Sequence, residues 1–165
     1  ITGTVLAQII PIVLQPFLRR LYAPEEFGVY AIYLSVISVF AAIINGKYDS
    51  AIVLPDSDDD SNQLVGLSLI ISLAVISLLY FIVFLFNEEI VSLLKLPFEE
   101  SYVLYLLPVG IFFMGFYQAL NFWLIRKKQF KKSSINKVSR RGSEGVVQLM
   151  SGYFGLGSFG LIIGA

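Results

Sequence analysis

The run LVGLSLIISLAVISLLYFIVFLF, from Leu64 to Phe86, contains 23 consecutive residues without a formal charge. A membrane-spanning helix needs about 20 apolar residues, because each residue adds about 1.5 Å along a hydrocarbon core about 30 Å thick. A buried helix of a soluble protein would show a polar stripe on one face, and this run carries no charged stripe at all. We therefore predict that residues 64–86 cross a membrane.

The rest of the chain has the same character. Only 15% of the 165 residues are charged, against about 25% in soluble domains, and the mean hydropathy is +0.77. Uncharged runs predict five membrane spans, at residues 1–18, 27–46, 64–86, 102–125 and 146–165, joined by loops at 19–26, 47–63, 87–101 and 126–145. The chain is thus predicted to be an all-α integral membrane protein, a multi-helix bundle with about five transmembrane helices. Since both ends lie inside apolar runs, we expect residues 1–165 to be the N-terminal portion of one longer transporter domain.

Proline followed by acidic residues marks the start of two predicted helices. Pro24 precedes Glu25 and Glu26, and Pro97 precedes Glu99. Proline suits the first helical position, and carboxylates in the first turn complement the helix dipole. We therefore expect helices to open at these two prolines.

The stretch RKKQFKKSSINKVSRR, from Arg126 to Arg141, holds eight of the twelve basic residues and no acid. Short loops rich in Lys and Arg stay in the cytoplasm. Placing the 126–145 loop inside also places the 47–63 loop inside, which leaves nine basic residues there and three outside. We predict a multi-pass protein of a bacterial or archaeal cell (inner) membrane, with both loops cytoplasmic. The basic block also suits contact with anionic membrane lipids. No nucleic-acid-binding motif accompanies it, so nucleic acid is not an expected partner.

The segment from Phe130 to Met150, which overlaps the block, has apolar residues near helical spacing, including Ile135, Val138 and Leu149. This pattern is typical of an amphipathic helix at the cytoplasmic interface. Gly142 and Gly145 are expected to bend the chain from that surface into the bilayer.

The composition excludes several kinds of chemistry. The chain has no Cys and no His, which excludes thiol catalysis and Cys-ligated zinc and removes most general-base schemes. Asp56, Asp58 and Asp60 alternate as in an EF-hand, but Ser61 and Leu67 stand where that loop needs Gly and Glu. We predict no metal, no cofactor, no catalytic residue and no enzymatic activity.

Polar residues within or beside the predicted spans are the candidate substrate contacts. Gln8 and Gln15 lie near prolines of the first span, and Gln118 and Asn121 lie in the fourth. Polar groups at such depth face the interior of a bundle. They either join helices through polar contacts or line a polar transport lumen. The Gly-rich GLIIG, with Gly160 and Gly164, is expected to allow close packing of helices.

Scarce basic residues border the first two spans. Arg19 and Arg20 follow the first span, and Asn45 and Lys47 end the second. They either snorkel to the headgroups or contact an anionic substrate, for which arginine offers bidentate recognition. The candidates for a substrate lumen are therefore Gln8, Gln15, Arg19, Arg20, Asn45, Lys47, Gln118 and Asn121.

Four stretches of the chain resemble a known family. PFLRRLYAPEEFGVYAIY (residues 16–33), NGKYDSAIVLPDSDD (45–59), NFWLIRKKQFKK (121–132) and GYFGLGSFGLIIG (152–164) occur in the order typical of the polysaccharide-biosynthesis flippases. These are the Wzx-type exporters of O-antigen (the lipopolysaccharide glycan) and capsule. They belong to the superfamily that includes the multidrug and toxin extruders (MATE). The resemblance covers nearly the whole chain.

The resemblance implies a MATE-like bundle of two pseudo-symmetric halves, of which this chain is most of the first. It implies export of an undecaprenyl-pyrophosphate-linked oligosaccharide across the cytoplasmic membrane by alternating access. The expected partners are that lipid-linked substrate, membrane lipids and other polysaccharide-assembly proteins. Two alternatives are a drug/cation antiporter of the same superfamily and a non-transporting membrane subunit of a glycan-assembly complex. Because the antiporter would need an intramembrane carboxylate, and none of the five predicted spans contains Asp or Glu, the first interpretation is favoured.

Overall fold

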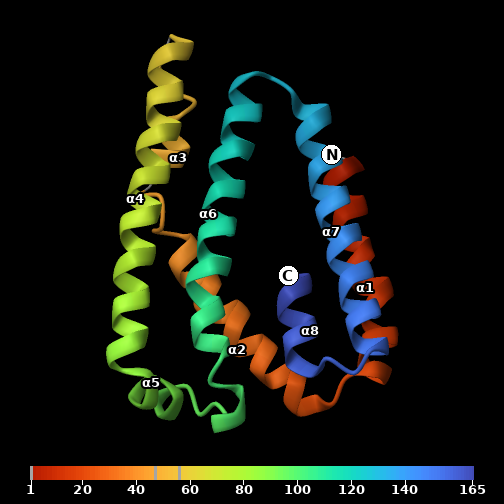
Figure 1. Ribbon diagram of the computed structural model, residues 1–165. Helices are drawn as coiled ribbons and strands as arrows, with labels where there is room; N and C mark the ends of the chain where they lie inside the picture. Colours follow the sequence, from red (N-terminus) through yellow and green to blue (C-terminus); the bar gives the residue numbers. More distant parts are fainter. Residues whose placement is uncertain (1, 47, 56) are drawn as a thin grey trace. The chain divides into compact units, whose positions relative to one another are not determined.

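The computed structural model describes residues 2–46, 48–55 and 57–165, and over these ranges it contains only helices and the turns that join them (Figure 1). This confirms the all-α prediction. The helices are, in chain order, α1 (Thr2–Leu21), α2 (Pro24–Ala41), α3 (Tyr48–Ala51), α4 (Asp58–Leu85), α5 (Asn87–Leu93), the 3-10 helix η1 (Phe98–Glu100), α6 (Val103–Arg126), α7 (Phe130–Tyr153) and α8 (Gly157–Gly164).

The helices form two compact units. The terminal unit comprises Ile1–Ile32 and Phe130–Ala165, and the central unit comprises Tyr33–Gln129. In the terminal unit α7 packs against both α1 and α8, and in the central unit α4 packs against α6. Helix α2 begins in the terminal unit and ends in the central unit.

Two segments of the described chain are long and apolar enough to cross a membrane. They are Asp58–Leu85, with 28 residues and a hydropathy of 2.7, and Phe98–Arg126, with 29 residues and a hydropathy of 1.8. They coincide with the predicted third and fourth spans, and a helix of 28 residues measures about 42 Å. The fold is that of a helical membrane bundle, and these two helices indicate a membrane location.

The acidic helix starts form largely as predicted. Helix α2 begins at Pro24, and Glu26 Oε2 accepts a hydrogen bond of 2.7 Å from the backbone N–H of Ala23, which satisfies one free donor at the helix end. Helix α4 begins after Ser57, whose side chain caps the N–H of Asp60 at 3.1 Å. Pro97 is followed first by η1, and α6 itself begins only at Val103.

The predicted loop at 126–145 is wrong, because α7 occupies most of it, whereas the helix that the apolar spacing predicts from Phe130 to Met150 is present. Helix α6 ends at Arg126, Lys128 takes a positive φ of 54°, and the N–H of Gln129 returns to the carbonyl of Leu124 at 2.9 Å. A left-handed residue of this kind commonly closes a helix. Helix α7 then runs without a break from Phe130 to Tyr153, so neither predicted bend at Gly142 or Gly145 occurs. Lys, Arg and Gln are good helix formers, and the charges of the Lys and Arg residues do not end a helix.

The predicted span at 146–165 is also wrong as a single helix. Helix α7 ends at Tyr153 and α8 starts at Gly157, with Gly155 and Gly157 at positive φ values of 68° and 58°. Glycine takes this conformation without steric cost because it lacks a Cβ. Helix α8 packs back on α7, and a Cβ at Gly160 would lie 2.5 Å from the Cβ of Ser151. The predicted close packing of the Gly-rich segment is therefore confirmed.

Two other predicted loops contain helices. The 47–63 segment includes α3 and the first turns of α4, and the 87–101 segment includes α5 and η1. The acids at 58–60 and the serine cap start α4 earlier than the apolar run alone indicates.

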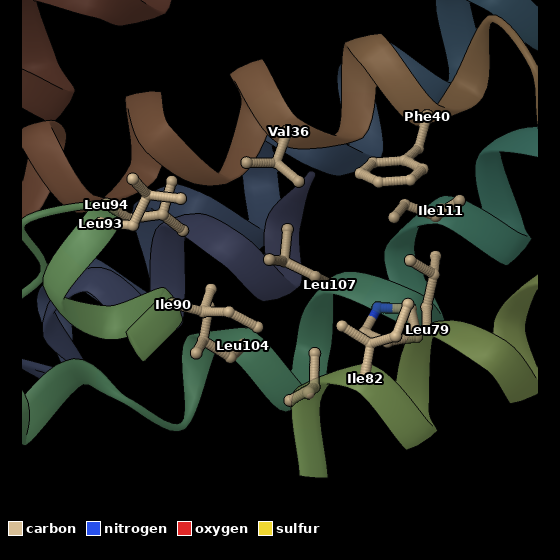
Figure 2. A pocket seen from close by; sticks show the side chains of 12 residues that line it. Val36, Phe40, Leu79, Ile82, Ile90, Leu93, Leu94, Leu104, Leu107 and Ile111 are labelled. Carbon is tan, nitrogen blue, oxygen red and sulfur yellow. The ribbon is translucent and has the colours of Figure 1, made fainter. Parts of the chain in front are cut away.

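An apolar cavity of about 230 Å³ lies in the central unit (Figure 2). Every side chain that lines it is a hydrocarbon: Val36, Phe40, Leu79, Ile82, Val83, Ile90, Leu93, Leu94, Leu104, Leu107, Pro108 and Ile111. A cavity without polar partners does not hold ordered water. The polar residues of this unit gather elsewhere, at the end of α2 and around the C-terminus of α6.

Candidate functional site

Gln148 of α7 is the centre of a buried polar network in the terminal unit. Its side chain is 5% exposed, and Nε2 donates hydrogen bonds to the hydroxyl of Tyr30 at 3.2 Å and to the carbonyl of Leu161 at 3.0 Å. The hydroxyl of Tyr22 donates to the backbone carbonyl of Gln148 at 2.6 Å. One residue of α7 is thereby bonded to α2, to α8 and to the turn after α1. Buried networks whose members are satisfied make a packing arrangement rigid and unique.

Tyr22 is a stable donor in this network. Burial raises the pKa of its phenol, and the nearby Glu26 carboxylate raises it further. The phenol therefore keeps its proton at neutral pH. Its ring packs with Leu18 and Leu161 in the core of this unit.

Polar side chains form a continuous stripe along one face of α7. Positions three and four apart lie on the same face of a helix, and this spacing joins Lys137, Arg140, Arg141, Glu144, Gln148 and Ser151, which we call the polar stripe. Within it, Arg141 Nη1 donates to both carboxylate oxygens of Glu144, at 3.1 and 2.8 Å. The sequence predicted an amphipathic helix here, but it placed this helix at the cytoplasmic interface and did not predict a polar stripe beside α1.

Two glycines fix the register of α7 against α1. A Cβ at Gly145 would lie 2.0 Å from Leu14 Cδ1, and a Cβ at Gly152 would lie 3.1 Å from Leu21 Cβ. The two contacts are seven residues apart on both helices, so α1 and α7 run in the same direction, side by side (Figure 1). The polar stripe therefore lies alongside α1 for most of its length.

The lumen candidates of α1 lie on its exposed surface. Gln8, Gln15, Arg19 and Arg20 are all exposed. Steps of seven and four residues place Gln8, Gln15 and Arg19 on one face of the helix, beside the face that packs on α7. Their role in a lumen stays a prediction.

Asn45 joins three segments of the central unit. It is 2% exposed, Nδ2 donates to the carbonyl of Gly115 in α6 at 3.0 Å, and Oδ1 accepts from the hydroxyl of Ser72 in α4 at 2.6 Å. Both ends of its amide are thus engaged in contacts between helices, whereas the sequence had placed Asn45 at the end of the second span as a candidate for headgroup or substrate contact. The other candidates of this unit, Gln118 and Asn121, are half-buried on α6, and Lys47 lies outside the described residues.

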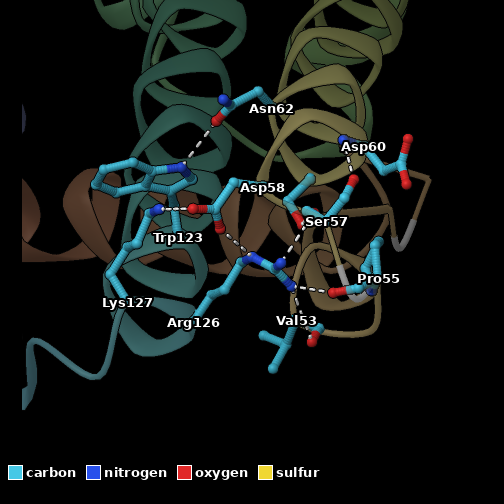
Figure 3. A network of polar contacts seen from close by, with 10 residues as sticks. Val53, Pro55, Ser57, Asp58, Asp60, Asn62, Trp123, Arg126 and Lys127 are labelled. Carbon is cyan, nitrogen blue, oxygen red and sulfur yellow. Dashed lines mark hydrogen bonds and ion pairs between the residues drawn. The ribbon is translucent and has the colours of Figure 1, made fainter.

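Arg126 and Lys127 hold the segment before α4 to the end of α6 (Figure 3). The Arg126 guanidinium donates to the carbonyls of Pro55 and Ser57 and to Asp58 Oδ1, the last two at 2.9 and 3.3 Å. Lys127 Nζ donates to Asp58 Oδ2. The segments 47–63 and 126–129, both predicted to be cytoplasmic, therefore meet at one end of the central unit. Sequence reasoning missed this contact, although the opposite charges of two loops on the same side were a usable signal.

The charge of Asp58 is stabilised in this network. At about 42 Å, α4 is longer than a hydrocarbon core of about 30 Å, so its acidic first turn lies outside the membrane-spanning part. The hydrogen bond from Lys127, together with the Arg126 guanidinium, holds the pKa of the Asp58 carboxyl below its usual value. The carboxyl is ionised at neutral pH, and the network is an ion-paired junction rather than a proton-transfer site.

Comparison with known proteins identifies the family to which the chain belongs. Residues 17–165 match the family described as "Polysaccharide biosynthesis protein". The chain is 25% identical over 147 residues to the succinoglycan biosynthesis transport protein ExoT of Rhizobium meliloti (strain 1021). That match covers 89% of this chain and 29% of the relative's length. No solved structure matches the chain. Because the family match extends over nearly all of the described helices, the chain belongs to the polysaccharide biosynthesis protein family.

Proposed function

We propose that this chain is part of a flippase that moves a lipid-linked oligosaccharide, with an undecaprenyl-pyrophosphate carrier, across the cytoplasmic membrane. The observation that carries the proposal is the polar stripe of α7, which lies alongside α1, a mostly apolar helix that exposes Gln8 and Gln15. A transporter for a glycan needs such a polar surface within the membrane, because sugar hydroxyls lose their hydrogen bonds in hydrocarbon. The match to a transport protein of polysaccharide biosynthesis supports the same reading.

The substrate's chemistry suits both the polar stripe of α7 and the exposed apolar surfaces of the other helices. Its glycan and diphosphate are polar, and its carrier tail is a hydrocarbon. The polar groups would follow the stripe while the tail stays in the lipid. Alternating access by rocking of helical bundles would then move the headgroup. No bond is made or broken in this process, so no catalytic residue is required.

The alternative of a cation antiporter depends on an intramembrane carboxylate. Helix α7 does place one acid, Glu144, beside α1, next to the contact between Gly145 and Leu14. Both of its oxygens accept from Arg141, and its side chain is only 12% exposed. A carboxylate held in this way is poorly suited to exchange protons or sodium, which favours the anionic substrate.

The remaining lumen candidates take their proposed roles from their positions. Gln8, Gln15 and Arg19, on one face of α1, would contact the glycan or the diphosphate, and Arg20 would stand at the outer mouth. We further propose that Lys47, Gln118 and Asn121 extend the path. The loop 47–63 and the turn at 127–129 would lie in the cytoplasm, where other polysaccharide-assembly proteins can be reached.

The test uses the full-length protein reconstituted in liposomes with a fluorescent lipid-linked oligosaccharide. Transport would appear as label that becomes accessible to a glycan-cleaving enzyme on the opposite side. Replacing Gln8 and Gln15 together by Leu should lower the rate at unchanged protein level, and replacing Val13, which is exposed on another face of the same helix, by Leu should not. Liposomes that move cationic drugs but not the glycan would support the antiporter. Absence of both activities, with intact glycan assembly in cells only when the protein is present, would support a non-transporting subunit.

A further inference from the structure

The apolar cavity of the central unit is closed on one side and open on another. Leu104, Leu107 and Ile111 of α6 line it and are 0%, 6% and 1% exposed. Ile82 of α4 and Leu93 of α5 also line it, but they are 37% and 80% exposed. The cavity of about 230 Å³ therefore has a floor against α6 and a mouth between the end of α4 and α5 (Figure 2).

The surroundings of the mouth are apolar as well. Helices α4 and α6 belong to the two segments that are long and apolar enough to cross a membrane, and Phe81, Leu85 and Phe86 are exposed at the same end of α4. An apolar cavity of about 150 Å³ stays dry and takes up benzene. An empty cavity forfeits the dispersion contacts of its lining. A hydrocarbon chain of the surrounding lipid therefore suits this cavity as its occupant.

A buried donor without a partner lies beside the cavity. Nδ2 of Asn87, the first residue of α5, is buried and has no hydrogen-bond partner among the residues that the structure describes. Asn87 precedes Ile90 and Leu94 by three and seven residues, so all three share the face of α5 that lines the cavity. A buried donor without an acceptor is costly. An occupant of the cavity that brings an acceptor would remove this cost.

The charges next to Asn87 select the kind of acceptor. Glu88 and Glu89 follow it in the chain, and both are exposed. Two carboxylates repel a phosphate group, which carries the same sign of charge, but they do not repel a neutral carbonyl. In a glycerolipid, an ester carbonyl stands at the head of each hydrocarbon chain, at the boundary between hydrocarbon and headgroups. The apolar end of α4 meets the two acids at just such a boundary.

We propose that the central unit binds one acyl chain of a glycerophospholipid in this cavity, and that the ester carbonyl of that chain accepts a hydrogen bond from Asn87 Nδ2. The carboxylates of Glu88 and Glu89 favour a zwitterionic headgroup over an anionic one. Because residues 87–101 are predicted to lie outside, the lipid is expected to come from the outer leaflet. The inference goes beyond the proposed function and does not depend on the transport of any substrate.

The experiment measures the lipid that the full-length protein retains in native mass spectrometry. The probes are dioleoyl phosphatidylethanolamine and its diether analogue, which lacks both ester carbonyls. We expect the diester lipid to be retained about three- to fivefold better, which is the difference that one hydrogen bond makes. Asn87→Ala should remove this preference without lowering the melting temperature, because Nδ2 gives up no bond within the described residues. The control, Ser92→Ala at an exposed position of α5, should keep the preference.

A second pair of variants tests the cavity itself. Ile82→Trp places a larger side chain at the mouth and should lower the retention of both lipids. Leu78→Trp, at an exposed position of α4 outside the lining, should change retention by less than about twofold. Melting curves show whether each variant is folded. If Ile82→Trp does not fold, the comparison of the two lipids on the unaltered protein still decides the contact with Asn87.

Three results would overturn the inference. The first is equal retention of the diester and diether lipids by the unaltered protein, and the second is full retention by a folded Ile82→Trp variant. The third is displacement of the phospholipid by undecaprenyl phosphate in the unaltered protein but not in Ile82→Trp, which would assign the cavity to an isoprenoid tail. Better retention of phosphatidylglycerol than of phosphatidylethanolamine would contradict the role of Glu88 and Glu89. Carbonyl-dependent retention by a protein that does not move lipid-linked glycan would support the site while the proposed function fails.

Discussion

Replacing Asn45 by Ala tests whether this residue packs helices together or lines a transport path. The substitution removes two hydrogen bonds, one to Gly115 and one from Ser72. Side-chain hydrogen bonds between membrane helices average about 0.6 kcal/mol each, which gives about 1.2 kcal/mol for the pair. Neither partner is left without a bond, since Ser72 also donates to the carbonyl of Ser68 at 2.8 Å and the Gly115 carbonyl lies inside α6. Loss of the buried amide's packing adds to this, so we expect the free energy of unfolding to fall by about 1–2 kcal/mol.

The assay is unfolding of the purified full-length protein in mixed micelles by added SDS, followed by circular dichroism. The matched control is Ser77→Ala, on the same helix as Ser72, because the Ser77 hydroxyl is exposed and donates to the carbonyl of Leu73 in its own turn. The control should change stability by less than about 0.5 kcal/mol. A double-mutant cycle of Asn45→Ala with Ser72→Ala should show a coupling energy near 0.6 kcal/mol.

Two results would refute this reasoning. If Asn45→Ala unfolds like Ser77→Ala, then the buried bonds contribute nothing to the packing of the central unit. If transport is lost while the unfolding curve is unchanged, Asn45 contacts substrate, as the sequence-based interpretation of a lumen would have it.

Three other predictions follow from the packing, the ion pairs and the orientation. Gly145→Ala should destabilise the protein by about 1–3 kcal/mol through overpacking, because the new Cβ would lie 2.0 Å from a leucine of α1. Gly142→Ala should instead stabilise α7 by up to about 1 kcal/mol, because no atom lies within 4 Å of the new Cβ. Denaturation of both variants checks this, and equal changes in stability would contradict the α1–α7 register. Because the pKa of Asp58 is lowered in the folded protein, its ion pairs stabilise the fold above the usual carboxyl pKa, and this stabilisation is lost as the pH falls through the lowered value. Asp58→Asn should reduce that acid-dependent loss of stability in a pH series of melting curves. An unchanged pH profile would show that the ion pairs of Asp58 do not contribute to stability. Single cysteines replacing Ser57 and Ser92 should react with impermeant reagents from the cytoplasmic and the outer side respectively, and labelling of both from one side would contradict the predicted topology.

The amino-acid sequence by itself determined the class of the fold and where its most apolar helices lie. The run at 64–86 and the run at 102–125 reappear as α4 and α6, because a long uncharged segment has one stable form in a membrane, the helix that satisfies its own backbone. The start of α2 was also predictable, since proline and the two glutamates act locally on the first turn.

The tertiary structure decided what the remaining polar residues do. Local patterns indicated both a loop at 126–145 and an amphipathic helix from Phe130 to Met150, and they assigned residues 146–165 to one span. Helix α7 instead runs from Phe130 to Tyr153 and is followed by Gly155 and Gly157, both with positive φ. A charged segment is equally compatible with a loop and with a helix, and only packing partners select between them. Leu14 against Gly145 and the bonds of Gln148 to Tyr30 and Leu161 provide those partners for α7. They come from segments more than a hundred residues away or from beyond a turn, which no local pattern encodes. For the same reason the sequence placed Asn45 only at the end of the second span, and its contacts with Ser72 and Gly115 showed that its amide joins helices.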